Sequence, residues 1–343
     1  MRILLTGGSG SVGKAVVETL VHCGHEVLVI GRSAGVQLTG ARYEVCDINN
    51  YARLRELARG QDAIVHLAAV PNPGITTPEE LFRINTSGTF NVFQAAAEEG
   101  IRRVIQASSI NAAGQFYGVK PAILHYLPLD EAHPVFSTDA YSFSKHVIED
   151  IGEFFWRREG ISSLAYRLPW VAPAEMHERI GPRRAGIQAA VDRLLGLSVD
   201  ERRAWFETAW ATYNEFRATR PYEKLDGYAY RVISEMPEDQ RAKIHLMSSR
   251  ANFFTMLDER DSAQAVEKGL RAPFEGAHAL YINDSQNMAG VESSILAELF
   301  YPDVKMFKSG LSGCGSLVSI EKARSLIGFE PEFSFGEGTN NHE

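Results

Sequence analysis

The stretch of sequence that decides the fold is Leu5-Thr6-Gly7-Gly8-Ser9-Gly10-Ser11-Val12-Gly13. An apolar run leads into it, and apolar residues at helical spacing follow it, so we predict a strand, a tight turn and a helix. Gly7 suits a crowded turn, Gly10 leaves room for a phosphate against bare backbone, and Gly13 lets the helix lie close to the strand. The free N–H groups at the start of the helix would then face the anion.

The glycines follow the spacing G-x-x-G-x-x-G, which differs from the usual dinucleotide spacing G-x-G-x-x-G. Three glycines in one turn also occur in ordinary loops. The strand before the turn and the helix after it favour a nucleotide site over that alternative.

The composition describes a globular chain that is long enough for a large core. It has 343 residues, of which 45% are hydrophobic and 23% charged, and its formal net charge is −8. No block of Lys and Arg stands out, which argues against a nucleic-acid or anionic-membrane surface. No apolar run approaches the length of a membrane span, and we expect a cytoplasmic protein. The three cysteines show no metal spacing, and we expect Cys23 and Cys46 to be buried.

Apolar segments without alternation, separated by helical patterns, run through the first half of the chain. We predict strands at 3–5, 26–30, 43–46, 63–67, 103–107 and 163–166, and helices at about 50–57, 78–99 and 139–158. This alternation predicts an α/β fold, a Rossmann-type doubly wound parallel sheet covered on both faces. Ligands of such sheets bind beyond the carboxyl ends of the strands, where Gly7, Arg32, Asp47, Ala68 and Ser109 would lie.

The texture of the sequence changes near residue 172. We predict a dinucleotide-binding domain over residues 1–171, a smaller helix-rich substrate lobe over 172–335, some segments of which return to the sheet domain, and a disordered tail over 336–343. Within the lobe, residues 174–250 form a charged, aromatic-rich helical insertion that includes a capping box at Ser198 and Glu201. Its aromatic residues either pack the lobe against the sheet domain or serve as a lid or a subunit contact. A strand at 279–282 and helices at 290–300 and 319–327 follow.

A second candidate site lies in Asp139-Ala140-Tyr141-Ser142-Phe143-Ser144-Lys145. Tyr141 and Lys145 are four residues apart, so one helical turn places both on the same face. A nearby ammonium would stabilise the phenolate and lower the pKa of the phenol, which suits acid/base work on a hydroxyl or carbonyl. Ser108 and Ser109 end the preceding strand and offer a hydroxyl at the same edge of the sheet.

These motifs, in this order, resemble the extended short-chain dehydrogenases/reductases of the NAD-dependent epimerase/dehydratase family. The resemblance covers Met1 to Val171 well and the rest loosely. The residues that carry it are Thr6 to Gly13, Asp47-Ile48, Val65-His66-Leu67-Ala68-Ala69, Asn85-Thr86-Ser87-Gly88-Thr89, Ala107-Ser108-Ser109, Tyr141 to Lys145 and Arg167-Leu168-Pro169.

The resemblance implies a role for each of these residues. Tyr141 would be the acid/base, Lys145 would tune it and bind the nicotinamide ribose, and Ser109 would hold the reacting oxygen, with Ser108 as the alternative. Asp47 would meet the adenine, and Asn85 would brace the site. Besides these, the residues expected to contact the cofactor are Gly7, Gly10, Ser11, Val12, Gly13, Ile48, Leu67, Ala68, Ala69, Leu168 and Pro169. The alternatives are a capping Asp47, purely packing Ala68 and Ala69, and a structural Asn85.

Two departures from the family pattern bear on cofactor and reaction. The second strand ends in Gly31-Arg32, where an acidic residue would hold the ribose 2′-hydroxyl of NAD. An arginine there favours the 2′-phosphate of NADP, although it also fits an ordinary exposed side chain. Ser109 is followed by Ile110-Asn111 in place of the acidic pair of the sugar-nucleotide dehydratases, which argues against a dehydratase. Asn111 is therefore expected to bind a substrate hydroxyl.

The resemblance therefore implies hydride transfer, with NADP or NAD, at a secondary alcohol or ketone carbon of a sugar, sugar acid or nucleotide sugar. Tyr141, Ser109 and Asn111 would contact this substrate, and no metal is expected. Segment 111–117 resembles members that oxidise free sugar acids, but the sequence does not decide between epimerase and dehydrogenase. A non-sugar alcohol or ketone as substrate and a non-catalytic cofactor-bound regulator remain alternatives.

Relatives often pair through helices beside the Tyr141 segment, which implies a homodimer. His177, Arg179, Arg183 and Arg184 would either bind a substrate anion or form a solvated face.

Overall fold

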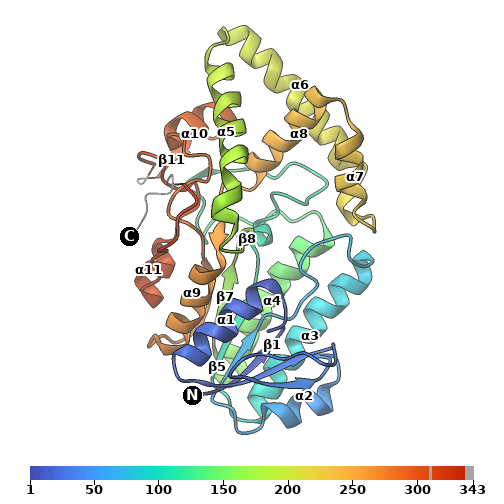
Figure 1. Ribbon diagram of the computed structural model, residues 1–343, viewed down its shortest axis with the longest axis vertical. Helices are drawn as coiled ribbons and strands as arrows, with labels where there is room; N and C mark the ends of the chain where they lie inside the picture. The colour runs from blue at the N-terminus through green and yellow to red at the C-terminus, as the bar shows by residue number, and fades with distance from the viewer. Residues whose placement is uncertain (309–310, 337–343) are drawn as a thin grey trace.

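The centre of the protein is one seven-stranded parallel sheet, with strand order β10-β7-β5-β4-β1-β2-β3. A computed structural model describes residues 1–308 and 311–336 (Figure 1). The strands of this sheet are β1 (Arg2–Thr6), β2 (Glu26–Gly31), β3 (Arg42–Val45), β4 (Ala63–His66), β5 (Arg103–Ala107), β7 (Ser162–Arg167) and β10 (Ala277–Tyr281). The chain leaves β1 toward β2 and β3, then returns to the other side of β1 at β4. The strand order therefore reverses between β1 and β4, as the predicted doubly wound fold requires.

Helices cover both faces of the sheet. The helices of the sheet domain are α1 (Ser11–His22), α2 (Tyr51–Ala58), α3 (Pro78–Glu98), α4 (Ala140–Glu159) and α9 (Glu259–Arg271). Ile3 and Leu5 of β1 pack with residues of α1 and α9, whereas Leu4 packs with residues of α2, α3 and α4. Side chains of a strand alternate between the two faces, and both are buried here, which explains the apolar runs without alternation.

Two predictions about burial need correction. The edge strand β3 is exposed over most of its length, so the sheet is covered on both faces only in its central strands. Cys23 is half-exposed, because it ends α1 and precedes the turn at Gly24, while Cys46 is buried as predicted.

The chain after β7 builds the second lobe. Its helices are α5 (Met176–Leu195), α6 (Val199–Ala218), α7 (Tyr228–Glu235), α8 (Glu238–Ala251), α10 (Ser293–Phe300) and α11 (Glu321–Ile327), with 3₁₀ turns η1 (Ile110–Ala113) and η2 (Pro221–Glu223) before and within it. Two short parallel pairs complete it: β8 (Val171–Ala172) with β9 (Leu257–Asp258), and β6 (Tyr126–Leu127) with β11 (Met306–Phe307). The predicted strand near 279–282 is β10, which joins the edge of the main sheet beside β7.

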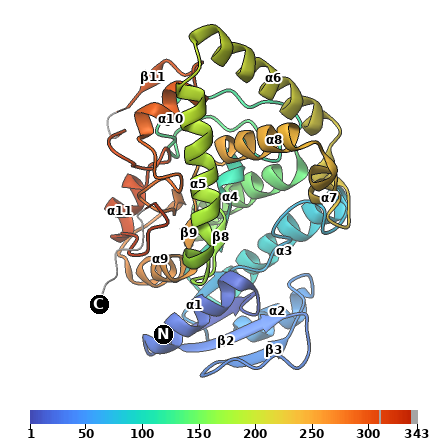
Figure 2. The same ribbon diagram turned by 45° about the horizontal axis from the view of Figure 1, so that its top comes forward.

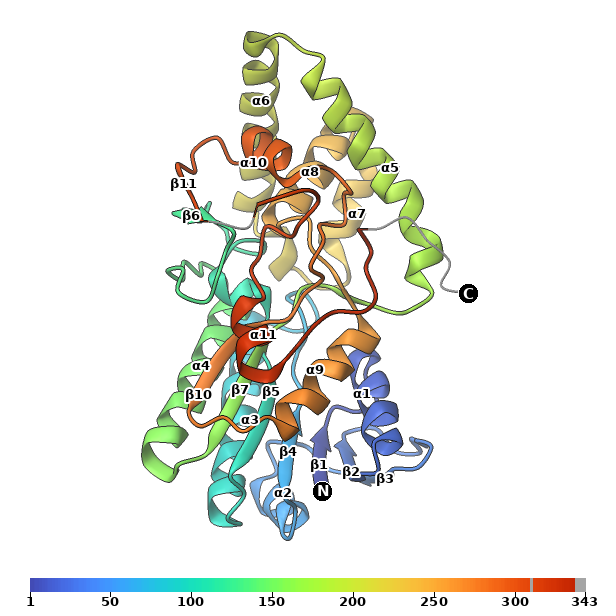
Figure 3. The same ribbon diagram turned by 90° about the vertical axis from the view of Figure 1, so that its left-hand side faces the viewer.

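Helices α5 to α8 form the predicted insertion and rise above the sheet domain (Figures 1 and 2). The capping box at Ser198 and Glu201 starts α6. Aromatic residues of α6, including Tyr213 and Phe216, build a core with α7, α8 and η2 rather than lying on the sheet. Helices α10 and α11 lie on the opposite side of the molecule from α7 (Figure 1), and this side faces the viewer in Figure 3.

Of the predicted tail, residues 337–343 lie outside the described residues. No helix in the described part of the chain is both long and apolar enough to span a lipid bilayer. Within the same residues, no group of three or more His, Cys, Asp or Glu is placed to hold a metal ion.

Candidate active site

The glycine turn after β1 has the shape that its sequence predicts. The N–H of Gly7 donates to the carbonyl of Ile30 at 3.0 Å, and φ at Gly7 is +80°, a conformation that favours glycine. A Cβ on Gly7 would lie 2.6 Å from the backbone nitrogen of Ala68, and one on Gly13 would lie 2.6 Å from Cα of Gly8. A Cβ on Gly10, in contrast, would meet only the carbonyl oxygen of Gly7, at 3.4 Å. The turn is therefore closed by packing at its two ends and open at Gly10, the N-cap of α1.

That opening fits the pyrophosphate of a dinucleotide. Helix α1 starts at Ser11, so the unpaired N–H groups and the positive dipole end of its first turn lie at Gly10. Ser11 is exposed and Val12 is half-buried beside it. These residues can hold an anion without a basic side chain.

A chain of buried hydrogen bonds fixes the turn to β4 and α3. The Thr6 hydroxyl accepts from the N–H of Ala68 at 3.1 Å and lies 2.7 Å from Nδ1 of His66. Nε2 of His66 lies 3.0 Å from the Thr89 hydroxyl, which donates to the carbonyl of Asn85. These partners are all satisfied when His66 is neutral and protonated at Nε2. Burial, with a smaller effect of the Lys145 charge, lowers the pKa of His66 to about 3.

Leu67, Ala68 and Ala69 follow β4 and are half-exposed at the carboxyl end of the sheet, beside the glycine turn. Asn85 lies below them and is buried. Its amide oxygen accepts from the N–H of Val70 at 2.7 Å, and its amide nitrogen donates to the Val70 carbonyl and to the Ser144 hydroxyl. Asn85 therefore ties the segment after β4 to α4, which is the arrangement of a brace.

The residues predicted at the adenine end lie at the ends of β2 and β3. Arg32 is exposed and immediately follows β2. Asp47 is also exposed, and one carboxylate oxygen accepts from the backbone N–H of Asn49 at 2.8 Å, so it stabilises the turn before α2. Ile48 is buried against α3 at Gly88, where a Cβ would not fit.

Tyr141 and Lys145 lie in the first turns of α4, which Asp139 caps by accepting from the N–H of Ser142 at 2.8 Å. Both side chains are buried, with the Lys145 ammonium 5.8 Å from the centre of the Tyr141 ring. The ammonium donates to the carbonyl of Ala107, the last residue of β5, at 2.7 Å. The spacing of four residues thus brings the pair together at the carboxyl end of β5.

The predicted direction of the Tyr141 shift is wrong. Burial raises the pKa of Tyr141 to about 12, and hydrogen bonding to the Ser109 side chain only partly offsets it. Burial also lowers the pKa of Lys145 to about 8, against the favourable charge of Glu149. Desolvation is the largest effect on each group, because both side chains are almost completely enclosed. At neutral pH the phenol is therefore protonated and suited to donate a proton.

The two serines after β5 face different partners. Ser109 hydrogen bonds with Tyr141 and caps η1 by accepting from the N–H of Asn111 at 3.1 Å. Ser108 instead donates to Glu149 at 2.6 Å. Glu149 also receives two hydrogen bonds from Arg167, at 3.0 and 2.7 Å, in a buried ion pair behind α4. The structure thus places Ser109, and not Ser108, beside the phenol.

On the substrate side, Asn111 is buried and its amide oxygen accepts from the N–H of Phe116 at 3.3 Å. The carbonyl of half-buried Leu168 accepts from the N–H of Ile110 and so holds η1 on β7, with Pro169 buried next to it. The ring of Tyr117 packs edge-on against the ring of Tyr141, with centroids 5.4 Å apart.

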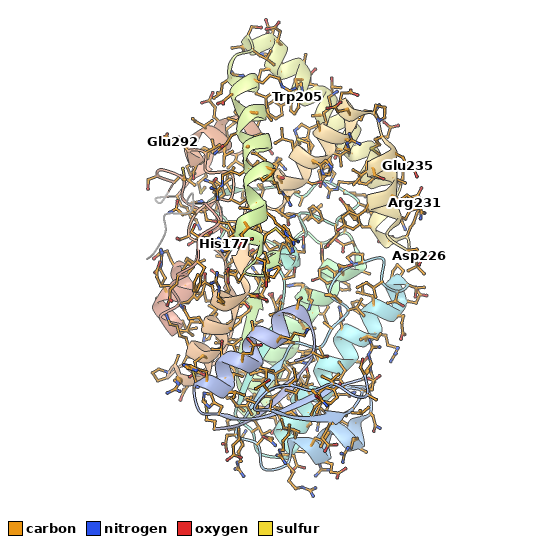
Figure 4. The ribbon with its side chains drawn as sticks, viewed as in Figure 1. His177, Trp205, Asp226, Arg231, Glu235 and Glu292 are labelled. Atoms are coloured by element: carbon orange, nitrogen blue, oxygen red, sulfur yellow. The ribbon has the colours of Figure 1, made fainter. Side chains whose placement is uncertain are left out.

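The charged residues at the start of α5 lie elsewhere. His177 hydrogen bonds to Asp258 at 2.9 Å and stacks on Phe335 at 4.0 Å, at the lower end of α5 (Figure 4). Arg183 lies over the Trp170 ring, and Arg179 is exposed. Arg184 is half-buried beside Gly290. His177 and Arg183 thus have partners within the protein, while Arg179 faces solvent, and binding of a substrate anion by this segment stays a prediction.

The sequence reasoning missed Glu149, Arg167 and Tyr117. Glu149 follows Lys145 by four residues on the same helical face, a spacing that could have indicated it. Tyr117 lies in a loop, where periodicity gives no signal.

Comparison with known proteins gives a consistent result. The model of the NAD-dependent epimerase/dehydratase family matches residues 3–191. The chain is 31% identical over 180 residues to L-arabinose 1-dehydrogenase (NAD(P)(+)) of Haloferax volcanii, which covers 51% of this chain and 68% of that protein. It is 32% identical over 183 residues to a uronate dehydrogenase of Pseudomonas syringae, covering 52% and 62%. The match thus spans less than two thirds of the uronate dehydrogenase.

Among solved structures, a short-chain dehydrogenase/reductase superfamily protein of Agrobacterium tumefaciens with bound NAD superposes with a TM-score of 0.61. The sequences are 21% identical, and the match covers 98% of this chain and 94% of that one. The fold similarity therefore extends over the second lobe, where the sequence matches end.

Proposed function

Because the chain belongs to the NAD-dependent epimerase/dehydratase family of extended short-chain dehydrogenases/reductases, we propose that it is an NAD(P)-dependent dehydrogenase of a free sugar or sugar acid. The observation that carries the proposal is the contact between Tyr141 and Ser109, with Lys145 beside them, at the same sheet edge as the glycine turn. In this assignment residues 1–171 bind the cofactor and residues 172–335 shape the substrate site. The names of the two relatives support a free sugar or sugar acid as substrate.

When bound, the nicotinamide accepts or supplies the hydride. Ser109 and Tyr141 hold the reacting oxygen, and Tyr141 gives a proton to it in reduction or takes one in oxidation. Lys145, fixed by the Ala107 carbonyl, keeps a positive charge next to the phenol. Asn111 contacts a second hydroxyl of the substrate, and Leu67, Ala68 and Ala69 line the cofactor's path from the glycine turn.

The test is the change in absorbance of the reduced nicotinamide when purified protein is mixed with NAD or NADP and a panel of aldoses and uronic acids. We expect Tyr141→Phe to lower kcat by about 100-fold or more, since general acid/base catalysis is worth about 10² to 10⁴. Tyr126→Phe, which removes a phenol of the β6–β11 pair that donates to Asp130, is the matched control. Turnover of Tyr141→Phe within a few-fold of wild type would remove Tyr141 from the proposal.

An epimerase is the second candidate, because the chain is also 30% identical over 158 residues to a UDP-glucose 4-epimerase of Streptomyces lividans. An epimerase retains its oxidised or reduced cofactor through the reaction, whereas a dehydrogenase exchanges it. Mass spectrometry of small molecules released from the purified protein separates the two. A dinucleotide held in equal amount to protein, with epimer formation from a UDP-sugar and no net change in reduced cofactor, would support the epimerase. If the protein binds the cofactor but turns over no alcohol or ketone, the result would favour the non-catalytic, cofactor-bound regulator.

A further inference from the structure

The helical insertion reaches the candidate active site through a group of aromatic rings. Tyr222 of η2 is buried and lies 5.3 Å from the rings of both Phe116 and Tyr117, centre to centre. Tyr117 in turn packs edge-on against Tyr141 at 5.4 Å. The insertion is therefore in contact, through one intermediate ring, with the phenol proposed as acid/base.

A buried arginine of the insertion holds the loop that carries these rings. Arg217, near the end of α6, is only 4% exposed. Its guanidinium donates to the carbonyls of Gly118 at 2.6 Å, Lys120 at 3.0 Å and Gln115 at 3.3 Å. It also lies 5.1 Å from the centre of the Tyr213 ring. One planar group thus satisfies three carbonyls on both sides of Tyr117.

Burying the Arg217 guanidinium costs free energy, which suggests that its hydrogen bonds to loop 115–120 have a function. Burying a cation is unfavourable, and hydrogen bonds to its N–H groups offset part of that cost. The fork of donors fixes three points of the loop at once, which a lysine could not do. A loop of this kind would otherwise move on its own, because its carbonyls have no strand or helix to pair with.

We propose that Arg217 is a positioning residue of the active site, which fixes loop 115–120 so that the Tyr117 ring closes one side of Tyr141. Tyr222 supports the same ring from behind. The proposal rests on the acid/base role proposed for Tyr141. Its consequence is that the insertion, remote in sequence from the motifs of the first 171 residues, sets the hydration of the catalytic phenol.

The effect on Tyr141 has a defined direction. The titratable and hydrogen-bonding groups that face or adjoin this phenol are Ser109, Asp139, Lys145 and Tyr117, and the Glu223 carboxyl of η2 lines the same pocket as Asp139 and Tyr141. Enclosure raises its pKa, and Tyr117 contributes to the enclosure through its ring contact. A loosened loop admits water, so the phenol's pKa falls toward its ordinary value of about 10.

The first experiment is a double-mutant cycle with Arg217→Met and Tyr117→Ala. We expect each single variant to lower kcat/KM for sugar oxidation by about tenfold. The rising limb of its pH profile, along which Tyr141 loses its proton, should move to lower pH. In the Tyr117→Ala background, Arg217→Met should add less than about twofold, because its effect passes through Tyr117. An equal loss in both backgrounds would overturn the proposal.

The matched control is Arg250→Met. Arg250 is also a buried arginine of the insertion, but its guanidinium donates to the carbonyl of Phe300 in the second lobe. We expect this variant to lose stability and to keep the wild-type pH profile. The same shift in both arginine variants would show a general effect of destabilisation and would refute the specific role of Arg217.

Hydrogen exchange of backbone amides 115–120 provides a measurement that needs no activity. Arg217→Met should raise exchange there at least tenfold, and Arg250→Met should not. Unchanged exchange in Arg217→Met would refute the anchoring of the loop, whatever Tyr141→Phe shows. If Arg217→Met does not accumulate as folded protein, Arg217→Lys, which keeps the charge but cannot reach three carbonyls, is measured in its place by the same criteria.

Discussion

Arg32 is the residue from which we infer a preference between NAD and NADP. It is exposed directly after β2, and no hydrogen bond or ion pair holds its guanidinium among residues 1–308 and 311–336. An arginine there can pair with the 2′-phosphate of NADP, and no carboxylate at this position repels that phosphate. We propose NADP as the preferred cofactor on this ground.

Arg32→Ala should weaken NADP binding by about tenfold and leave NAD binding nearly unchanged, because one exposed charge-assisted contact is worth about 1–2 kcal/mol. Isothermal titration with each oxidised cofactor measures both affinities. Arg59→Ala, on the far side of α2 and paired with Glu99, is the control. If Arg32→Ala and wild type show the same ratio of NADP to NAD affinity, Arg32 does not determine the cofactor preference.

His66 makes stability depend on pH. Its folded-state pKa of about 3 lies below the ordinary value of about 6.5, so between these values the unfolded chain binds a proton that the folded protein does not. The contribution of His66 to stability is therefore present above pH 6.5 and is lost as the pH falls toward 3.

His66→Gln should flatten this dependence, since an amide can replace both ring contacts without titrating. Urea unfolding at several values between pH 7 and 5 should show a slope smaller by up to about 1.4 kcal/mol per pH unit. His22→Gln, at the exposed end of α1, should keep the wild-type slope. If the two variants give the same slope, His66 is not the group responsible.

For single residues, the sequence predicts which side chains belong to the candidate site better than it predicts what surrounds each of them. The pairing of Tyr141 with Lys145 follows from a spacing of four, and the structure confirms that the two side chains meet. The raised pKa of Tyr141 could not be predicted, because it depends on side chains from other segments that enclose the phenol. Choosing between Ser108 and Ser109 required the direction in which β5 presents each side chain.

In the turn between β1 and α1, Gly13 is needed for close packing, whereas Gly10 leaves space that we propose for the pyrophosphate. A methyl group on Gly13 would collide with the backbone of Gly8, while one on Gly10 would meet little beyond the carbonyl of Gly7. Gly13→Ala therefore has to displace the turn, whereas Gly10→Ala leaves the protein intact and fills the space proposed for the pyrophosphate.

We expect Gly10→Ala to keep the thermal midpoint within a few degrees of wild type and to weaken cofactor binding by tenfold or more. Gly13→Ala should lower the midpoint as well, by several degrees. Differential scanning fluorimetry with and without cofactor measures both effects. Wild-type cofactor affinity in Gly10→Ala would show that the phosphates bind elsewhere.

Element boundaries in the sheet domain follow closely from the sequence, and those in the second lobe follow less well. Strand β5 has the predicted limits, and α4 differs by one residue at each end, because Asp139 and Gly160 give clear caps. The short pairs β8–β9 and β6–β11 were not predicted, since their strands have two residues each and meet partners far along the chain. The aromatic spacing in α6 predicted a helix correctly, but not that its residues pack with α7 and α8.

For the whole molecule, the outer face of α3 and α4 carries the feature that bears on assembly. Phe90, Phe143 and Phe154 are each 39–48% exposed, and Phe90 stacks on Phe154 across the two helices. Exposed apolar side chains that lie together on one face are a feature of association sites. We propose that two copies of the chain pair through this face, as the family resemblance implies.

Light scattering during gel filtration should give twice the chain mass of 38.0 kDa. The double variant Phe90→Glu/Phe154→Glu should run as a monomer, because like charges would replace the apolar contact. Tyr230→Glu, which changes an aromatic residue that is 70% exposed on α7, is the control and should remain dimeric. A monomeric wild type would contradict the pairing.

The amide of Asn85 has a mechanical consequence for the whole enzyme. One side chain grips the backbone at Val70 and, through the Ser144 hydroxyl, the Tyr141 carbonyl. The segment after β4, which we propose lines the cofactor's path, is therefore tied to α4, which carries the proposed acid/base. We therefore expect any movement that admits substrate to occur outside this joined pair, in the lobe beyond residue 171.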